Sequence, residues 1–240
     1  MSRLSKLPRT TPFDTIAVTV LLVAALVLAG KGWLADHPEH DPSAPLDLRD
    51  PRGMATEAKL AALLDDPEEC RAVLERSEVA FTSLDPVGEG ECRRADRLTL
   101  DTAPLSPGRA QLTCPVAVGL ALWVEDIQPL AEAELGSRIE RIEQMGTYSC
   151  RRIGGGEGGN WSEHATGNAI DLGAFVLDDG QRISVLGDWD GGEPAGRFLR
   201  AARDSACDSF GTVLSPDYNA AHADHLHLDQ GRSPMFAFCR

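Results

Sequence analysis

The sequence predicts an α+β fold: a small antiparallel sheet with flanking helices, preceded by one N-terminal hydrophobic helix. Segments with the apolar spacing of helices are mixed with short strand-like segments, some of which are joined by tight turns. A single long run without charges lies near the N-terminus, at residues 16–29. No internal repeat is present, so we expect one domain at residues 55–240, preceded by a helical part at 1–35 and a linker at 36–54.

The N-terminal part has the charge pattern of a membrane-targeting segment. Arg3, Lys6 and Arg9 precede the charge-free run, and positive charges of this kind keep that end of the chain in the cytoplasm. If Lys31 extends its charge to the interface, a helix over residues 13–35 is long enough to cross a bilayer. The sequence therefore predicts a cytoplasmic basic tip and a single anchor in the inner membrane, with cleavage as a signal peptide as the alternative.

Residues 36–54 are predicted to be a linker because they combine acidic residues with four prolines: Pro38, Pro42, Pro45 and Pro51. Prolines at this density disfavour both helix and strand. His37 and His40 lie in the same segment, and we expect them to be solvated.

Helices are expected in three regions of the domain. Residues 55–76 show a helical apolar face, and Pro67 should divide them into two short helices, the second beginning near Asp66. A longer helix should begin after Thr113 as its N-cap and end at Gly136. Residues 194–207 form the last predicted helix.

The predicted strands are short. Residues 98–112 alternate weakly and contain two prolines, which indicates short strands or extended chain. A strand at about 139–150 is followed by five glycines within residues 154–159, which we interpret as a flexible loop. A hairpin with strands at 168–177 and 182–186 comes next, and the last strands are expected at 211–214 and 225–229.

The charge of the domain argues against two classes of partner. The formal net charge is −14 for the whole chain. The first 35 residues hold four basic residues and one acidic residue, so the remainder, with 19 basic and 36 acidic residues, carries −17. Such a surface repels nucleic acid and anionic lipid headgroups, and we expect neither to bind the domain.

All six cysteines follow the hydrophobic run, and their spacing fits no CxxC zinc or redox motif. An even number of cysteines beyond a targeting segment favours up to three disulfides in an oxidising compartment, with six buried thiols as the alternative. Sequence alone leaves the pairing open. The working hypothesis joins cysteines that are consecutive in the chain: Cys70–Cys92, Cys114–Cys150 and Cys207–Cys239.

Side chains suited to chemistry are concentrated in two short clusters. The first, SEHATGNAID, contains His164 and Asp171, seven residues apart across Gly167. That spacing suits a loop that folds back onto a strand, where small neighbours leave room beside Asp171. The second cluster, HADHLHLD, holds three histidines and two aspartates, and its candidate site residues are His222, Asp224, His225 and His227. In a strand, His225 and His227 project to the same side.

Two imidazoles and one carboxylate form a ligand set that suits Zn²⁺. We therefore expect one zinc ion bound by His164, Asp171 and His227, with a fourth position open for water as in catalytic zinc sites. His225 is the candidate general base and Asp224 the alternative, since a free histidine titrates near pH 6.5. Histidines without any metal, and a structural metal site without catalysis, are the competing interpretations.

The motif S-x-H-x-x-G-x-A-x-D followed by H-x-H resembles the signature of the LAS metallopeptidases, which include lysostaphin-type enzymes, D-Ala-D-Ala carboxypeptidases and murein endopeptidases. Every fixed position is filled, by Ser162, His164, Gly167, Ala169, Asp171, His225 and His227. The resemblance implies a LAS/Hedgehog-like metallopeptidase core, the same three zinc ligands, His225 as base or oxyanion partner, and His222 in support.

A second resemblance covers more of the chain. The region from about Cys70 to Cys239 resembles the bacterial extensin-like C-terminal domain family, on the runs YSCR, SEHATGNAIDL, DW and DHLHLD. In LAS carboxypeptidases an arginine after the corresponding strand contacts a substrate carboxylate or the developing oxyanion. The resemblance implies this role for Arg151, with Arg152 as the adjacent alternative and a surface cation without such a role as the competing interpretation. The glutamine that usually follows is absent, and the glycine loop takes its place.

These observations predict a zinc-dependent peptidase or amidase that acts on the peptide crosslinks of peptidoglycan, with its domain in the periplasm. A non-catalytic protein that binds the cell wall and carries a metal site is the alternative. A periplasmic zinc-binding module without affinity for the wall is a third interpretation.

Overall fold

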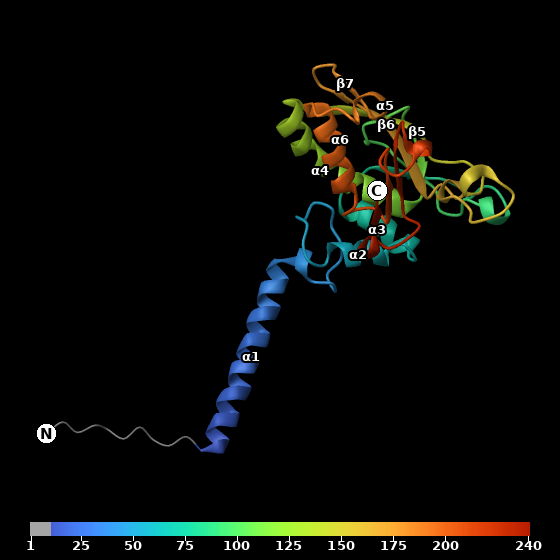
Figure 1. Ribbon diagram of the computed structural model, residues 1–240. Coiled ribbons are helices and arrows are strands. Elements are labelled where there is room, and N and C mark those ends of the chain that lie inside the picture. The colour runs from blue at the N-terminus through green and yellow to red at the C-terminus, as the bar shows by residue number, and fades with distance from the viewer. Residues whose placement is uncertain (1–10) are drawn as a thin grey trace.

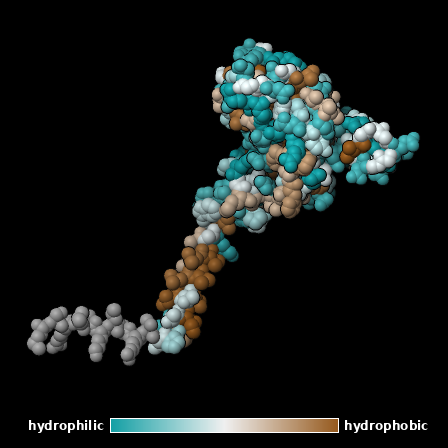
Figure 2. All heavy atoms as spheres, in the orientation of Figure 1, coloured by the Kyte–Doolittle hydropathy of each residue, from teal (hydrophilic) through white to brown (hydrophobic). Residues whose placement is uncertain are grey.

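The structure is a computed structural model and describes residues 11–240; the predicted basic tip with Arg3, Lys6 and Arg9 lies outside the described residues. Helix α1 (Pro12–Asp36) begins at a capping box formed by Thr11 and Asp14 and buries none of its residues. It stands apart from the domain (Figure 1), and its surface is hydrophobic along most of its length (Figure 2). It is long and apolar enough to cross a membrane, as a span or as a signal sequence.

Most of the predicted linker is in contact with the domain. Lys59 donates a hydrogen bond to the Pro38 carbonyl at 2.7 Å, and the Ala55 amide donates to the Glu39 carbonyl at 3.1 Å. Leu46 is buried, and Arg52 forms an ion pair with Asp126. The prolines exclude long helices and strands, as expected, but these contacts hold the segment against the domain surface.

The two linker histidines are not free in solvent. Both stack against Trp33 at the end of α1, with ring-centroid distances of 4.5 Å for His37 and 5.1 Å for His40. The Nδ1 atom of His40 also accepts a hydrogen bond from the Met54 amide at 3.0 Å. Our expectation of solvated histidines is therefore correct only in part: both rings are half-buried, because the short turn η1 (Pro38–His40) folds back onto the helix end.

The helices follow the sequence prediction closely. Helix α2 (Thr56–Ala62) is separated from α3 (Pro67–Arg76), whose N-cap is Asp66. Helix α4 (Cys114–Leu135) begins after Thr113 and ends at Gly136, which has the left-handed conformation that stops helices. Helix α6 (Pro194–Ala206) matches the last predicted helix. Helix α5 (Val185–Asp188) was not predicted, and it replaces the end of the strand expected at 182–186. The short 3₁₀ turns besides η1 are η2 (Gly90–Cys92), η3 (Ile153–Gly155), η4 (Glu163–Ala165), η5 (Ala220–His222) and η6 (Pro234–Phe236).

The larger sheet has the order β10-β8-β9-β6-β5-β3, and β7 pairs with the second half of β6. Its long strands are β5 (Ile139–Gly146) and β6 (Ala169–Leu177). Its short strands are β3 (Leu105–Ser106), β7 (Arg182–Ser184), β8 (Thr212–Leu214), β9 (Leu226–Asp229) and β10 (Phe238–Cys239). All pairs are antiparallel except β3 with β5 and β10 with β8. The sheet is therefore mostly antiparallel, as predicted, with parallel pairs at both edges.

A smaller antiparallel sheet contains β1 (Phe81–Ser83), β2 (Leu98–Leu100) and β4 (Gln111–Leu112). The core lies between the larger sheet and helices α4 and α6, which lie side by side (Figure 1). Phe175 on β6 packs edge-on against Trp123 of α4 and Phe198 of α6, with centroid distances of 6.0 and 5.2 Å. The opposite face of the sheet is left to carry polar side chains.

The six cysteines form three disulfides: Cys70–Cys114, Cys92–Cys150 and Cys207–Cys239. Of the predicted pairs, only Cys207–Cys239 is confirmed, and Cys70–Cys92 and Cys114–Cys150 were wrong. The reason is the packing of α3 against the start of α4, which brings Cys70 next to Cys114 inside the core, where both are fully buried. Cys92 and Cys150 are then joined at the surface.

Candidate metal centre

Strands β6 and β9 bring Asp171 and His227 side by side. The two residues are direct partners in the antiparallel register. Side chains alternate between the two faces of a strand, so the hydrophobic neighbours Ile170, Leu226 and Leu228 point into the core, where they are fully buried. Asp171 and His227 therefore share the face of the sheet that α4 and α6 do not cover.

His164 reaches the same place from a loop. Its turn η4 is capped by the Ser162 hydroxyl, which accepts a hydrogen bond from the His164 amide. Gly167 has a φ of +77°, a conformation that residues with a Cβ rarely adopt. It turns the chain back into β6, as the sequence analysis expects of a loop folding onto a strand.

The three side chains converge on one point. The Nε2 atom of His164 lies 3.2 Å from Oδ1 of Asp171 and 3.1 Å from Nδ1 of His227. The same Nδ1 atom lies 2.9 Å from Oδ1 of Asp171. Both histidines are buried and Asp171 is largely so. Among the described residues this is the group of histidine and acidic side chains whose geometry could hold a metal ion.

Asp229 is a member of the site that the sequence analysis missed. Its Oδ2 atom lies 2.9 Å from Nε2 of His227, and its Oδ1 atom accepts a hydrogen bond from the Gly231 amide at 2.9 Å. Asp229 is two residues after His227 on one strand, so it lies on the same face, and its register partner is the small Ala169. The two-residue spacing between His227 and Asp229 is the sequence signal from which Asp229 could have been predicted. The carboxylate fixes the His227 ring with Nδ1 directed at the other two ligand atoms.

His225 and Asp224 form the edge of the site just before β9. The Nδ1 atom of His225 lies 2.8 Å from Oδ1 of Asp224, and its Nε2 atom lies 3.5 Å from Oδ1 of Asp171. Asp224 thus orients the His225 ring toward the three converging ligand atoms. The geometry places Asp224 behind His225, so the two candidate bases of the sequence analysis are hydrogen-bonded to each other.

The electrostatics of the centre are dominated by the coupling of carboxylates and imidazoles. Burial raises the pKa of Asp171, but hydrogen bonds with His164 and His227 outweigh burial and hold that pKa well below its usual range. Burial alone lowers the pKa of His227, yet its hydrogen bonds to Asp171 and Asp229 raise the pKa to about 9. Without a metal ion, His227 is therefore protonated at neutral pH, and its positive charge lies between the negative charges of Asp171 and Asp229.

His222 lies at the mouth of the centre, with its ring centroid 5.2 Å from that of His225 and 5.8 Å from that of His227. Its Nδ1 atom is held by Oδ1 of Asn219 at 2.9 Å. Burial, together with the nearby charges of His225, His227 and Arg151, lowers the pKa of His222 to about 4. His222 is therefore neutral at physiological pH. Arg151 is exposed and lies near enough to contribute to this field.

Comparison with known proteins adds one decisive match. A protein-family model described as Extensin-like protein C-terminus matches residues 68–240, which include every residue of the site. The chain belongs to the extensin-like C-terminus family. Searches of curated proteins and of solved structures found no match.

A cavity of about 300 Å³ lies beside Asp224 in this extensin-like domain. It is lined by Asp224 and by side chains from the adjacent strands, including Met145, Arg182 and Ser184. A bulge in β6 at Gly173 shapes it, because the pairing with β5 skips that residue. The bulge reverses the alternation of side chains, so that Asp171 faces the site while Phe175 faces the core. A Cβ at position 173 would come within 2.9 Å of the Met145 sulfur.

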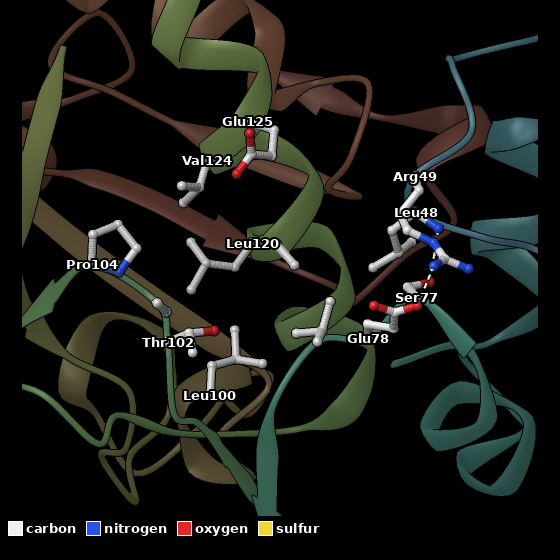
Figure 3. A pocket seen from close by; sticks show the side chains of 13 residues that line it. Leu48, Arg49, Ser77, Glu78, Leu100, Thr102, Pro104, Leu120, Val124 and Glu125 are labelled. Carbon is white, nitrogen blue, oxygen red and sulfur yellow. Dashed lines mark hydrogen bonds and ion pairs between the residues drawn. The ribbon is translucent and has the colours of Figure 1, made fainter. Parts of the chain in front are cut away.

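A second cavity, of about 510 Å³, lies elsewhere in the extensin-like domain. Leu100, Leu120 and Val124 form its apolar wall, and Arg49 and Glu78 form an ion pair at its edge (Figure 3). No histidine or cysteine lines it. Trp189 is buried and donates a hydrogen bond to Asp217. Neither feature belongs to the metal centre.

Proposed function

We propose that this extensin-like protein is a zinc-dependent peptidase or amidase that acts on the peptide crosslinks of peptidoglycan in the cell envelope. The observation that supports the proposal most strongly is the convergence of His164, Asp171 and His227, whose ligand atoms lie 2.9–3.2 Å apart. Ligands of a tetrahedral zinc ion, with bonds of about 2.0–2.1 Å, lie about 3.3 Å from one another. A zinc ion fits this triangle with shifts of a few tenths of an ångström.

The surroundings of the triangle also suit a catalytic zinc ion. The ligand set has one carboxylate and two imidazoles, and no fourth protein ligand closes it among the described residues. Asp229 supplies the carboxylate that commonly orients a zinc-binding histidine. With three protein ligands, a bound zinc ion acidifies a water molecule to a pKa of ~7 and polarises a carbonyl group.

The chain's own residues then have distinct tasks. His225, oriented by Asp224, accepts a proton beside the ligand triangle. Arg151 offers a fixed positive charge for a substrate carboxylate or oxyanion, and neutral His222 supports the mouth of the site. The cavity beside Asp224 is the proposed binding place for part of an extended peptide. The relation to the LAS metallopeptidases, inferred from the shared motifs, is part of this proposal.

We further propose that α1 anchors the protein in the inner membrane and that the domain lies in the periplasm. Three disulfides among the described cysteines suit an oxidising, extracytoplasmic compartment. The apolar helix α1 suits either a span or a signal sequence. The stem peptides of peptidoglycan are the proposed partners, and the acidic domain argues against nucleic acid.

Zinc affinity should depend on pH in a defined direction. Because the pKa of His227 is raised to about 9, metal-free protein holds a proton there at pH 7, and zinc must displace it. We expect the apparent affinity to rise with pH and to level off above about pH 9, with release of about one proton per zinc ion at pH 7. Calorimetric titration with zinc in two buffers of different ionisation enthalpy measures this proton. Identical heats in both buffers would contradict the assignment of His227 as a ligand.

The function is tested by incubating the zinc-loaded full chain with intact sacculi and analysing released muropeptides by mass spectrometry. We expect crosslinked muropeptides to disappear only when zinc is present. A His225→Ala variant should keep one bound zinc ion but lose hydrolysis by about 100- to 10,000-fold, as is typical when a general base is removed.

The alternative function, binding to the cell wall without turnover, gives a different result in the same incubation with sacculi. The protein would then pellet with sacculi while the muropeptide profile stayed unchanged with and without zinc. Hydrolysis by His225→Ala at the wild-type rate would show that His225 is not the base. A wild-type protein that neither binds zinc nor alters the profile would refute the proposed function altogether.

A further inference from the structure

Two loops at one edge of the domain are joined by the Cys92–Cys150 disulfide. One contains the turn η2 and the other leads into the glycine loop, and they project side by side from the sheet (Figure 1). In the sequence, each of these cysteines is followed directly by two arginines: Arg93 and Arg94, and Arg151 and Arg152. The disulfide, whose Cα atoms lie 5.5 Å apart, therefore brings four arginine residues close together along the backbone of an acidic protein.

None of these four arginines forms an ion pair with a carboxylate within the described residues 11–240. Arginines elsewhere in the domain, such as Arg138 and Arg197, do so. Glu89 and Glu91 lie on the same loop as Arg93 but are paired with none of the four in that part of the chain. Burial and the neighbouring charge of Arg97 lower the pKa of Arg94, as expected where positive charge is not neutralised.

Two of the four arginines are held in place by aromatic rings. The guanidinium carbon of Arg94 lies 4.0 Å from the centre of the Tyr148 ring, and that of Arg152 lies 4.3 Å from the Trp161 ring. Arg152 also donates a hydrogen bond to the Gly159 carbonyl, which closes the glycine loop. The other two, Arg93 and Arg151, are exposed and make no side-chain hydrogen bond to any described residue.

This arginine cluster adjoins the metal centre. The Ser162 amide donates to the Arg151 carbonyl at 3.1 Å, and the Ser149 amide donates to the His164 carbonyl at 3.0 Å. The Arg94 side chain lies 3.6 Å from the position that a Cβ would take at Gly167, in the loop that carries His164. The positive charge of Arg151 also contributes to the lowered pKa of His222 at the mouth of the site.

We propose that the Cys92–Cys150 disulfide builds an anion-binding wall beside the metal centre, in which Arg93 and Arg151 bind carboxylates of an acidic peptide. The inference rests on the proposed function and specifies its substrate class: a peptide with at least two free carboxylates near the scissile bond. A planar guanidinium binds a carboxylate through two parallel hydrogen bonds. Stacked Arg94 and Arg152 hold the two loops so that the exposed pair is presented to the ligand.

The test measures binding of two probes to the full chain kept metal-free by a chelator, so that zinc-dependent turnover cannot interfere. One probe is a synthetic stem peptide with free carboxylates, and the other is the same peptide with every carboxylate amidated. We expect Arg93→Gln and Arg151→Gln each to weaken binding of the free-carboxylate peptide by about tenfold and to leave the amidated peptide unaffected. Wild-type affinity for the free-carboxylate peptide should also fall with added salt.

Arg197→Gln is the matched control, since Arg197 is an exposed arginine on α6 paired with Glu134, and it should bind both peptides as the wild type does. Equal affinity of the wild type for the two peptides, or no binding of the free-carboxylate peptide, would overturn the inference. So would an equal loss for both peptides in the Arg93 and Arg151 variants. The proposed function can fail separately. If binding depends on the carboxylates but no zinc-dependent cleavage is seen, the peptidase assignment is refuted and the anion-binding role of the arginines stands.

Discussion

Replacing His227 with alanine is expected to abolish metal binding and, with it, hydrolysis of muropeptides. The variant loses one ligand atom, Nδ1, and leaves Asp171 and the buried Asp229 facing each other without the imidazole that joins them. The two remaining ligands, His164 on a loop and Asp171 on β6, are too few to retain one zinc ion per chain. Metal content by elemental analysis after dialysis, followed by mass spectrometry of digested sacculi, measures both losses.

Graded variants separate a metal effect from a folding effect. Asp229→Asn keeps all three ligands but loses the carboxylate that orients His227, so zinc affinity should fall about 10- to 100-fold. His164→Ala should reproduce the full loss, and His37→Ala, beside Trp33, should change nothing. Circular dichroism of each variant checks the fold. One bound zinc ion per chain in both His227→Ala and His164→Ala would contradict the assigned centre.

Removal of the Cys70–Cys114 disulfide should have a large effect on stability. The bond joins α3 to α4 inside the core and closes a loop with a sequence separation of 44 residues. On the loop-closure account, a bond of this span contributes about 4 kcal/mol to the free energy of unfolding. The double variant Cys70→Ala/Cys114→Ala should lose about that amount, measured by denaturant unfolding of the oxidised protein.

The Cys207–Cys239 pair is the natural comparison, because its sequence separation is 32 and its cysteines are partly exposed at the chain end. Its removal should cost somewhat less, about 3–4 kcal/mol by the same account. An unchanged unfolding midpoint in Cys70→Ala/Cys114→Ala would show that packing of α3 against α4 holds without the bond.

Local signals predicted most of the secondary structure. Asp66 and Pro67 start α3, and Gly136 ends α4, because capping and proline geometry act over a few residues. The three proposed ligand residues were also predicted, and the structure brings them together through the register of β6 with β9 and the turn at Gly167. Whether they bind zinc stays a prediction.

Features that depend on distant parts of the chain could not be predicted. The contacts of residues 36–54 with the domain involve Lys59 and Asp126, which no local pattern relates to a proline-rich segment. The bulge at Gly173 depends on the register with β5. Asp229 could have been found from its spacing to His227, but its burial against Ala169 appears only in the folded sheet.

The connectivity of two disulfides has a consequence for how the chain matures. Cys70–Cys114 and Cys92–Cys150 cross in the sequence, because Cys92 lies between Cys70 and Cys114. If the chain is exported from its N-terminus, Cys92 is the first partner that Cys70 meets, and oxidation in order of emergence gives the non-native pair Cys70–Cys92. Such a pair must be reshuffled by thiol–disulfide exchange before α3 can dock on α4. Folding of the exported domain then depends on a disulfide-exchange catalyst in the receiving compartment, and loss of that catalyst should deplete the protein even where oxidation itself is intact.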